Sequence, residues 1–279
     1  MKDLPIRLLA LDLDGTVFTD DKRITPTTLQ ALEEAIAAGV VVIPATGRPL
    51  DGLPQAFLEI PGVKYALTCN GAAVWRLADR TKLVDMPFST TQSLDAMSMM
   101  EQYRCTVDIY IDGKVYTTPE SLQNAELYAP ANMLEYIRAT RKPVDNLKEM
   151  IRQQNARVEK LNMFFFDPDE RSRALAQVQG CSWILPSWSM PENLELNAAG
   201  VDKGQGMLAL ASRLGIAPEQ TMACGDSVND LAMLKAAGLG VAMGNAAPDI
   251  QAQADAVTDS NQADGVAKAV YRYILGRSL

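Results

Sequence analysis

Short apolar runs recur towards both ends of the chain, and each stops at a small cluster of polar or glycine residues. The clearest runs are IRLLALDL at 6–13, GVVVIPATG at 39–47 and TMACGD at 221–226. Because they lack polar alternation, such runs predict strands that are covered on both faces, as in a parallel sheet. Helical segments separate the strands. The pattern therefore predicts an α/β fold with a doubly wound parallel sheet.

Helix signals between these strands support the same fold. Pro26 suits the first turn and Gly39 the end of a helix over residues 26–38. Two further strands are predicted, in YALTCNG (65–71) and in GLGVAMGN (238–245). Three further helices are predicted, of which one ends at Gly215, one ends at Gly238 and one covers 264–276.

The middle of the chain, residues 83–193, has a different pattern. TVDIYIDGKVYTT at 106–118 predicts a β-hairpin, because polar and apolar residues alternate on both sides of Asp112-Gly113. A further strand is predicted in VEKLNMFFF at 158–166. We expect an inserted α+β domain over 83–193 and a discontinuous core domain over 1–82 and 194–279.

Composition excludes several classes of function. The 279 residues carry a formal net charge of −8, which argues against nucleic acid or an anionic membrane as a partner. The chain contains no histidine, which removes Ser-His-Asp hydrolysis and histidine-ligated zinc. Acid–base catalysis near neutral pH must therefore use the side chains of Asp, Glu, Lys, Tyr or Cys.

The N-terminal sequence is not that of a signal peptide, because its apolar run is short and contains Arg7 and Asp12. No apolar run approaches the ~20 residues of a membrane span. We therefore expect a soluble, cytoplasmic protein with reduced thiols, since none of its cysteines forms a CxxC pair. The cysteines are Cys69, Cys105, Cys181 and Cys224.

Two carboxylates, Asp12 and Asp14, leave the first predicted strand together. Such crowding is unfavourable unless a cation lies between them, and Mg²⁺ prefers oxygen ligands. Gly15 allows a sharp turn. One carboxylate can attack phosphorus, and the other can donate a proton to the leaving oxygen and then activate water. An acidic surface turn is the alternative interpretation.

Two more candidate positions follow core strands. Thr46 and Gly47 end the second strand with a hydroxyl and exposed backbone N–H groups, which can hold phosphate oxygens. Lys203 lies at a helix start, where the helix dipole disfavours a cation. Its ammonium group can neutralise a phosphate. The alternatives are a glycine turn that opens a helix and a solvated lysine.

The fourth position is GDSVND at 225–230. One polar residue is enough to cap a helix, whereas this stretch offers Asp226, Ser227, Asn229 and Asp230. All four positions lie near carboxyl ends of predicted core strands, where α/β proteins bind ligands. They therefore predict one site, in which Asp12, Asp14 and Asp226 hold magnesium. Magnesium and Lys203 offset the repulsion between an anionic nucleophile and an anionic substrate.

At these residues the sequence resembles the haloacid dehalogenase superfamily. Its four motifs are matched in order by DLDGTV at 12–17, ATGR at 45–48, GVDKG at 200–204 and GDSVND at 225–230. The long insert between the second and third motifs resembles the Cof-type, subclass IIB phosphatases with a C2B cap. NGA at 70–72 and GVAMGNA at 240–246 are also similar to that group. The resemblance implies a Rossmann-like core with an inserted α+β cap.

The resemblance also implies roles for individual residues. Asp12 is implied to be the nucleophile and a metal ligand, and Asp14 the acid–base residue, which binds the metal through its backbone carbonyl. Lys203 is implied to orient nucleophile and phosphate. The remaining implied roles are phosphate binding by the Leu13 backbone, Thr46, Gly47 and Asn229, and metal binding by Asp226 with support from Asp230. Arg48 is a candidate for substrate binding, with a surface ion pair as the alternative.

We therefore expect a Mg²⁺-dependent phosphatase that hydrolyses small phosphorylated metabolites, such as sugar phosphates, through an aspartyl-phosphate intermediate. The resemblance implies a broad substrate profile and does not name one substrate. Two alternatives stay open: a phosphomutase or phosphotransferase with the same nucleophile, and a catalytically silent protein that binds a metabolite. The chain is expected to be a monomer or a small homo-oligomer.

Overall fold

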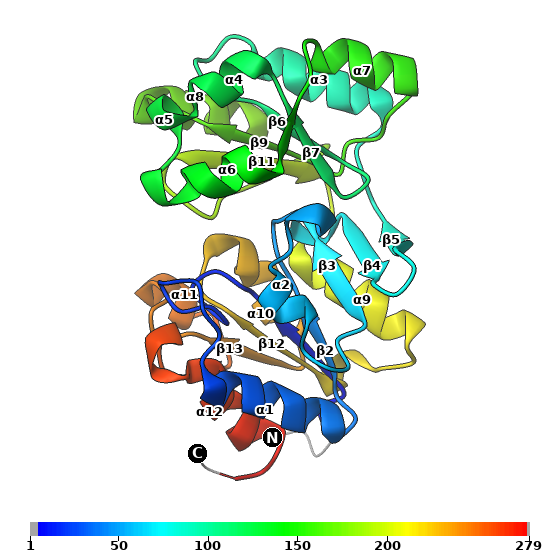
Figure 1. Cartoon of the computed structure of the whole chain (residues 1–279), viewed down its shortest axis with the longest axis vertical. Helices are drawn as coiled ribbons and strands as arrows, with labels where there is room; N and C mark the ends of the chain where they lie inside the picture. Colours follow the sequence, from blue (N-terminus) through cyan, green and yellow to red (C-terminus); the bar gives the residue numbers. More distant parts are fainter. Residues whose placement is uncertain (1–4, 278–279) are drawn as a thin grey trace. The chain divides into compact units, whose positions relative to one another are not determined.

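The computed structural model describes residues 5–277, and the chain divides into two compact units (Figure 1). The core unit comprises Met1–Gly47, Leu53–Val84 and Asp202–Leu279. The insert unit comprises Arg48–Gly52 and Asp85–Val201.

A five-stranded sheet lies at the centre of the core unit, in the order β14-β13-β12-β1-β2, and all its neighbouring strands are parallel. Its strands are β1 (Leu8–Leu11), β2 (Val41–Pro44), β12 (Thr221–Gly225), β13 (Leu239–Ala242) and β14 (Ala256–Val257). Every residue of β1 and β12 is buried. The predicted parallel sheet, covered on both faces, is confirmed, and the continuous apolar runs are its physical cause.

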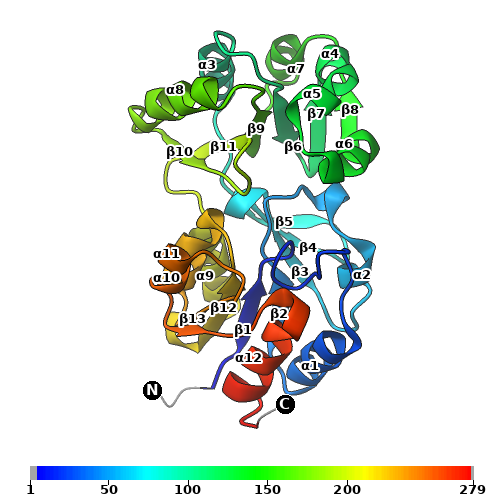
Figure 2. The same ribbon diagram turned by 90° about the vertical axis from the view of Figure 1, so that its left-hand side faces the viewer.

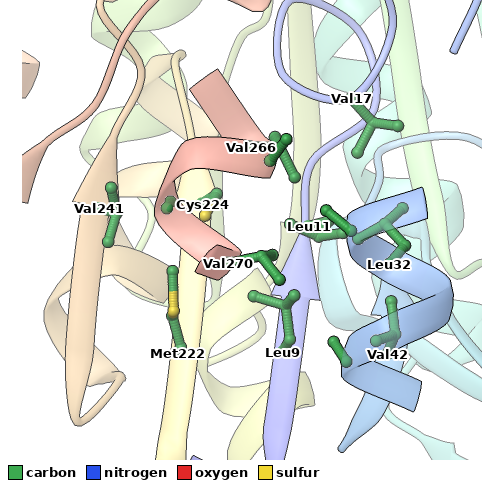
Figure 3. Close-up of a cluster of buried hydrophobic side chains, with 14 of the residues drawn as sticks. Leu9, Leu11, Val17, Leu32, Val42, Met222, Cys224, Val241, Val266 and Val270 are labelled. Atoms are coloured by element: carbon green, nitrogen blue, oxygen red, sulfur yellow. The ribbon is translucent and has the colours of Figure 1, made fainter. Parts of the chain in front are cut away.

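Helices α1 (Pro26–Ala37) and α12 (Gly265–Tyr273) pack against one another. Their apolar side chains meet alternate residues of the sheet, and Figure 3 shows Leu32 of α1 beside Leu11 of β1 and Val270 of α12 beside Leu9 of β1. The N-cap of α1 is Thr25, whose side chain accepts the backbone N–H of Thr28. The helix predicted over residues 26–38 is therefore confirmed.

A second pair of helices, α9 (Lys203–Arg213) and α10 (Leu231–Ala236), lies apart from α1 and α12 (Figure 2). A 3₁₀ turn over Val228–Asp230 leads into α10. The side chain of Asp202 caps α9 by accepting the N–H of Gln205 at 2.8 Å. The acidic residue Asp202 therefore caps α9 directly before Lys203, the lysine that the helix dipole disfavours at this position. The core unit also contains α2 (Gln55–Leu58) and α11 (Pro248–Gln251).

The strand predicted at 65–71 belongs to a different sheet from the one expected. It forms β3 (Tyr65–Thr68), which pairs antiparallel with β4 (Ala73–Arg76) in a three-stranded sheet completed by β5 (Thr81–Asp85). An isolated parallel bridge, between Ala45 and Leu67, connects it with the end of β2. The apolar run predicts the strand but does not identify its partner.

The insert unit contains a six-stranded sheet in the order β10-β11-β9-β6-β7-β8. Its strands are β6 (Asp108–Ile111), β7 (Lys114–Thr117), β8 (Arg141–Pro143), β9 (Lys160–Phe164), β10 (Ile184–Ser187) and β11 (Asn193–Ala198). The predicted hairpin is confirmed, since Ile111 pairs with Lys114 across Asp112 and Gly113, which have φ values of 48° and 76°. Positive φ at both loop positions matches a type I′ turn.

The two faces of the insert sheet differ in chemistry. The apolar face is covered by α3 (Thr90–Met100), α7 (Leu147–Gln154) and α8 (Pro168–Gln179). The other face carries buried ion pairs, which are Lys160–Glu195 at 2.6 Å and Arg141–Asp108 at 2.9 Å. The shorter helices are α4 (Pro119–Gln123), α5 (Ala125–Tyr128) and α6 (Leu134–Thr140).

The bounds of the insert unit differ from the predicted range of 83–193. Strand β11 pairs antiparallel with both β9 and β10, so the chain leaves the insert only after Val201. The short stretch Arg48–Gly52 also belongs to the insert, where the N–H of Asp51 donates to the carbonyl of Gly113 at 2.9 Å. Within residues 5–277, no helix has both the length and the apolar character of a membrane span.

Candidate active site

The carboxyl ends of three neighbouring parallel strands carry the first candidate residues. Leu11 in β1 pairs with Cys224 in β12 and with Pro44 in β2. Asp12 therefore begins the loop after the central strand, with the loops that contain Asp226 and Thr46 on either side. This is the edge at which open α/β sheets bind ligands.

Lys203 connects two carboxylates that are far apart in the sequence. Its Nζ atom donates to Oδ1 of Asp12 at 2.6 Å and to Oδ1 of Asp230 at 2.7 Å. Its side chain is 0% exposed. The interpretation of Lys203 as a solvated surface lysine is therefore wrong, and its position at the start of α9 places its ammonium group beside the predicted nucleophile.

Asp230 lies at the centre of this arrangement. Its Oδ1 atom accepts from Lys203, and its Oδ2 atom accepts the backbone N–H groups of Asp226 at 3.0 Å and Ser227 at 2.9 Å. Gly225 makes this packing possible, because a Cβ atom there would lie 2.5 Å from the Cβ atom of Asp230. One side chain therefore shapes the loop after β12 and holds the lysine.

Asp226 is held by the loop that follows Asp12. Thr16 donates from Oγ1 to Oδ1 of Asp226 at 2.8 Å. Gly15 has a φ of +83°, and a Cβ atom there would lie 2.5 Å from Oδ2 of Asp226. Glycine is thus required at position 15 both by its backbone conformation and by the space that the carboxylate occupies.

Burial and mutual repulsion perturb the acids of this group. Burial raises the pKa of Asp12 well above its usual range, and Asp230 raises it further against the opposing effect of Lys203. Burial and Asp230 raise the pKa of Asp226 to about 6. Burial lowers the pKa of Lys203, but the carboxylates of Asp12 and Asp230 together outweigh it and raise that pKa above its ordinary value. The lysine stays charged while the carboxylates repel one another.

The group is suited to a divalent cation. Asp12, Asp226 and Asp230 each offer one carboxylate oxygen, and these atoms lie within 4.8 Å of one another. Lys203 offsets one of the three negative charges, and a divalent cation can offset the other two. Carboxylate oxygens are of the ligand type that Mg²⁺ takes in proteins. The residues present therefore fit a hard divalent metal ion.

The carboxylate of Asp14 makes a different contact from the one that its spacing to Asp12 suggests. Its Oδ1 atom accepts from Nζ of Lys22 at 2.7 Å, in an ion pair near the surface. The third carboxylate beside Asp12 and Asp226 comes from Asp230. The implied role of Asp14 involves its backbone carbonyl as a ligand and its side chain as acid and base, and that role stays a prediction.

The remaining predicted residues divide between the two units. Thr46 is buried after β2, and its N–H donates to the carbonyl of Leu67 at 3.0 Å. Leu13 is buried and Gly47 is half-buried. Arg48 belongs to the insert unit, where its guanidinium group lies 4.5 Å from the ring centroid of Tyr136. The implied phosphate or substrate contacts of these residues stay predictions.

Asn229 contacts Asn70, which was not among the predicted site residues. Its Nδ2 atom donates to Oδ1 of Asn70 at 3.4 Å. The Oδ1 atom of Asn229 is buried and has no hydrogen-bond partner among residues 5–277. The only signal for Asn70 was the resemblance of NGA at 70–72 to Cof-type proteins.

Two further asparagines support the loop that contains Gly15. The Nδ2 atom of Asn245 donates to the carbonyl of Gly15 at 2.9 Å, and the Nδ2 atom of Asn261 donates to the carbonyl of Phe18 at 3.0 Å. Asn245 in turn accepts the backbone N–H of Asn261 at 3.0 Å. Sequence reasoning missed these roles, because the asparagines lie more than two hundred positions from the loop that they hold.

A parallel α/β core with this carboxylate and lysine group at its strand ends defines a class of hydrolase. The family model for haloacid dehalogenase-like hydrolases matches residues 9–270. The chain therefore belongs to the haloacid dehalogenase-like hydrolase family.

Named phosphatases align with this chain over almost its whole length. The 5-amino-6-(5-phospho-D-ribitylamino)uracil phosphatase YcsE of Bacillus subtilis is 29% identical over 98% of each chain. The pyridoxal phosphate phosphatase YbhA of Escherichia coli is 28% identical over 96% of this chain and 99% of its own.

Solved structures agree with these relatives. A haloacid dehalogenase-like hydrolase from B. subtilis has a TM-score of 0.85 and 27% identity over 95% of this chain and 99% of its own. A subclass IIB sugar phosphatase has a TM-score of 0.79 and 25% identity over 96% of this chain and 98% of its own. The chain is thus a Cof-type phosphatase, a hydrolase of phosphoric monoester bonds.

Proposed function

We propose that this phosphatase requires Mg²⁺ and hydrolyses small phosphorylated metabolites through an aspartyl-phosphate on Asp12. The observation that carries the proposal is the position of Lys203, which is fully buried and bonded to both Asp12 and Asp230. A buried network of charged groups is costly to desolvate, and such networks with perturbed pKa values concentrate at functional sites.

Asp12 has the position of a nucleophile. Its Oδ1 atom is engaged by Lys203, and the residue lies directly after the central strand β1. In the first step, a carboxylate oxygen of Asp12 forms a bond to phosphorus and the bond from phosphorus to the leaving oxygen breaks. Asp14, which must be protonated for this step and therefore released from its ion pair with Lys22, gives its proton to that oxygen. A water molecule then attacks phosphorus, Asp14 takes the proton of the water, and the bond between Asp12 and phosphorus breaks.

Charge is the main obstacle to this reaction. Two unit charges ~4 Å apart repel by about 4 kcal/mol at an effective dielectric constant near 20. Lys203 supplies one positive charge beside Asp12. A divalent cation held by Asp12, Asp226 and Asp230 would supply the rest of the charge that offsets this repulsion. Thr46 and Asn229 are proposed to hold the phosphate oxygens.

Relatives and one structural neighbour suggest which substrates to test. We propose that the substrate is a phosphomonoester of a sugar, a sugar-derived alcohol or a vitamin, because the named relatives act on a phosphoribityl compound and on pyridoxal phosphate. The subclass IIB neighbour is a sugar phosphatase. A broad profile over these compounds is expected.

The test is phosphate release from a panel of these phosphomonoesters, with Mg²⁺ and with EDTA. Asp12→Asn is the blank, because the amide has the same shape but cannot form the acyl phosphate. Asp249→Asn, at an exposed position, is the matched control and should keep wild-type activity. Acid-quenched enzyme should carry a phosphoryl group on the peptide that contains Asp12.

Release that persists in Asp12→Asn would contradict the mechanism. Release that is unchanged by EDTA would contradict the metal requirement. An isomerised phosphate ester without free phosphate would identify a mutase in place of a hydrolase. One substrate preferred by several orders of magnitude would contradict the broad profile.

A further inference from the structure

The chain directly after β3 has an unusual backbone. Cys69, Asn70 and Gly71 have φ values of 53°, 56° and 98°, so three consecutive residues adopt the left-handed conformation. For a residue with a Cβ atom, this conformation costs roughly 1–2 kcal/mol. All three residues are buried. Such strain persists only where the surroundings impose it, and it concentrates at functional sites.

The left-handed segment is bonded to the end of β2. The backbone N–H of Asn70 donates to the carbonyl of Thr46 at 3.1 Å, and the N–H of Thr46 donates to the carbonyl of Leu67 at 3.0 Å. Thr46 is therefore held on both sides by the stretch from β3 to Asn70. The position of this proposed phosphate-binding residue depends on the left-handed turn.

The same segment lies against the start of α9. A Cβ atom on Gly71 would lie 2.1 Å from the carbonyl oxygen of Asp202 and 3.3 Å from the backbone nitrogen of Lys203. Gly206, one turn along α9, also approaches the Cα atom of Gly71, since a Cβ atom there would lie 2.8 Å away. The backbone of the turn thus supports the helix start that carries Lys203.

The side chain of Asn70 reaches the third part of the site. Its Oδ1 atom accepts from Nδ2 of Asn229 at 3.4 Å, and Asn70 is 3% exposed. The Oδ1 atom of Asn229 is buried without a hydrogen-bond partner within residues 5–277. Of this amide, the Nδ2 N–H that does not bond Asn70 is the group that can donate to a phosphate oxygen, and the contact with Asn70 fixes its direction.

From these contacts we infer that Asn70 is a positioning residue for the phosphate site. Its backbone N–H holds Thr46, and its side chain orients Asn229. The adjacent Gly71 leaves room for the start of α9, which carries Lys203. Asn70 therefore sets the relative positions of groups from three separate segments. The inference rests on the proposed function, because it assigns Asn70 to the same site.

Asn70→Gly separates this role from a purely structural one. Glycine accepts a positive φ without strain, so the fold should keep or gain stability while the contact with Asn229 is lost. We expect kcat/KM to fall roughly 10- to 100-fold, the range in which small misplacements reduce catalysis. The midpoint of urea unfolding should not decrease.

The matched control is Asn155→Gly. Asn155 is also a left-handed asparagine, with a φ of 45°, but it ends α7 in the insert unit and accepts from Thr90. This variant should keep wild-type kcat/KM. The double variant Asn70→Gly/Asn229→Ala should be no less active than Asn229→Ala alone, because Asn70 acts through Asn229. Binding of inorganic phosphate in Mg²⁺, measured by calorimetry, should weaken in Asn70→Gly.

Wild-type kcat/KM and phosphate affinity in Asn70→Gly would overturn this inference alone, provided that Asp12→Asn is inactive. Additive losses in the double variant would also overturn it. A wild-type protein that neither turns over the panel nor binds inorganic phosphate would overturn the proposed function, and this inference with it.

Discussion

The Nζ atom of Lys203 lies 2.7 Å from Oδ1 of Asp230, and neither side chain is exposed to solvent. The same ammonium group bonds Asp12, and the other oxygen of Asp230 bonds the backbone after β12. The ion pair therefore joins the start of α9 to two loops of the parallel sheet. Breaking a buried pair costs more than the pair itself contributes, because the remaining charge stays buried without compensation.

Replacement of this lysine should therefore affect both stability and catalysis. Lys203→Met is expected to lower the free energy of unfolding by about 3–5 kcal/mol, because the buried carboxylates lose their counterion. Phosphatase activity should fall below detection. Urea unfolding and phosphate release measure the two effects. Lys235→Met, at an exposed position of α10, should change stability by no more than about 0.5 kcal/mol. Equal losses in the two variants would contradict the assignment.

Two glycines with similar backbone conformations allow strain to be separated from crowding. Gly15 and Gly39 have φ values of +83° and +89°, but a Cβ atom on Gly15 would meet Asp226 whereas one on Gly39 meets nothing within 4 Å. Gly39→Ala should cost about 1–2 kcal/mol of stability and leave activity unchanged. Gly15→Ala should also reduce kcat roughly 100-fold, because the carboxylate must move. Similar activity in the two variants would show that contact with Asp226 is unimportant.

Metal binding should be visible without turnover. Mg²⁺ at about 100 times its dissociation constant should stabilise the wild-type protein by about 2.7 kcal/mol, since it binds the folded state. Asp226→Asn should lose most of that stabilisation, while Asp249→Asn, at an exposed position, should keep it. Thermal unfolding with Mg²⁺ and with EDTA provides the measurement. A full Mg²⁺ shift in Asp226→Asn would place the ion elsewhere.

Local signals were sufficient for much of the fold. The continuous apolar runs predicted β1, β2, β12 and β13, because a strand buried on both faces needs apolar residues at every position. Asp112-Gly113 predicted the hairpin because few residue pairs accept two positive φ values. The partners of β3 and β11 were not predictable, since an apolar strand does not specify which edge it joins.

The site was predictable to a similar extent. Asp12, Lys203 and Asp226 were expected to converge, since carboxyl ends of parallel strands meet at one edge. The contact of Asp14 with Lys22 was not expected, nor was the central position of Asp230. Asn70 carried no chemical signal, because its contribution depends on a left-handed turn and on a partner 159 positions away.

The sequence by itself determined the four apolar strands of the core sheet, the hairpin of the insert, the start of α1, the order of the motifs and the chemical types at the site, because these follow from local patterns of side chains. Only the tertiary structure decided which carboxylates share the ammonium group of Lys203 and which asparagines hold the loops. A hydrogen bond forms only when donor and acceptor atoms approach closely and in a suitable direction. That approach depends on how closely separate segments pack, as at Gly71 against the start of α9 and at Gly225 against Asp230.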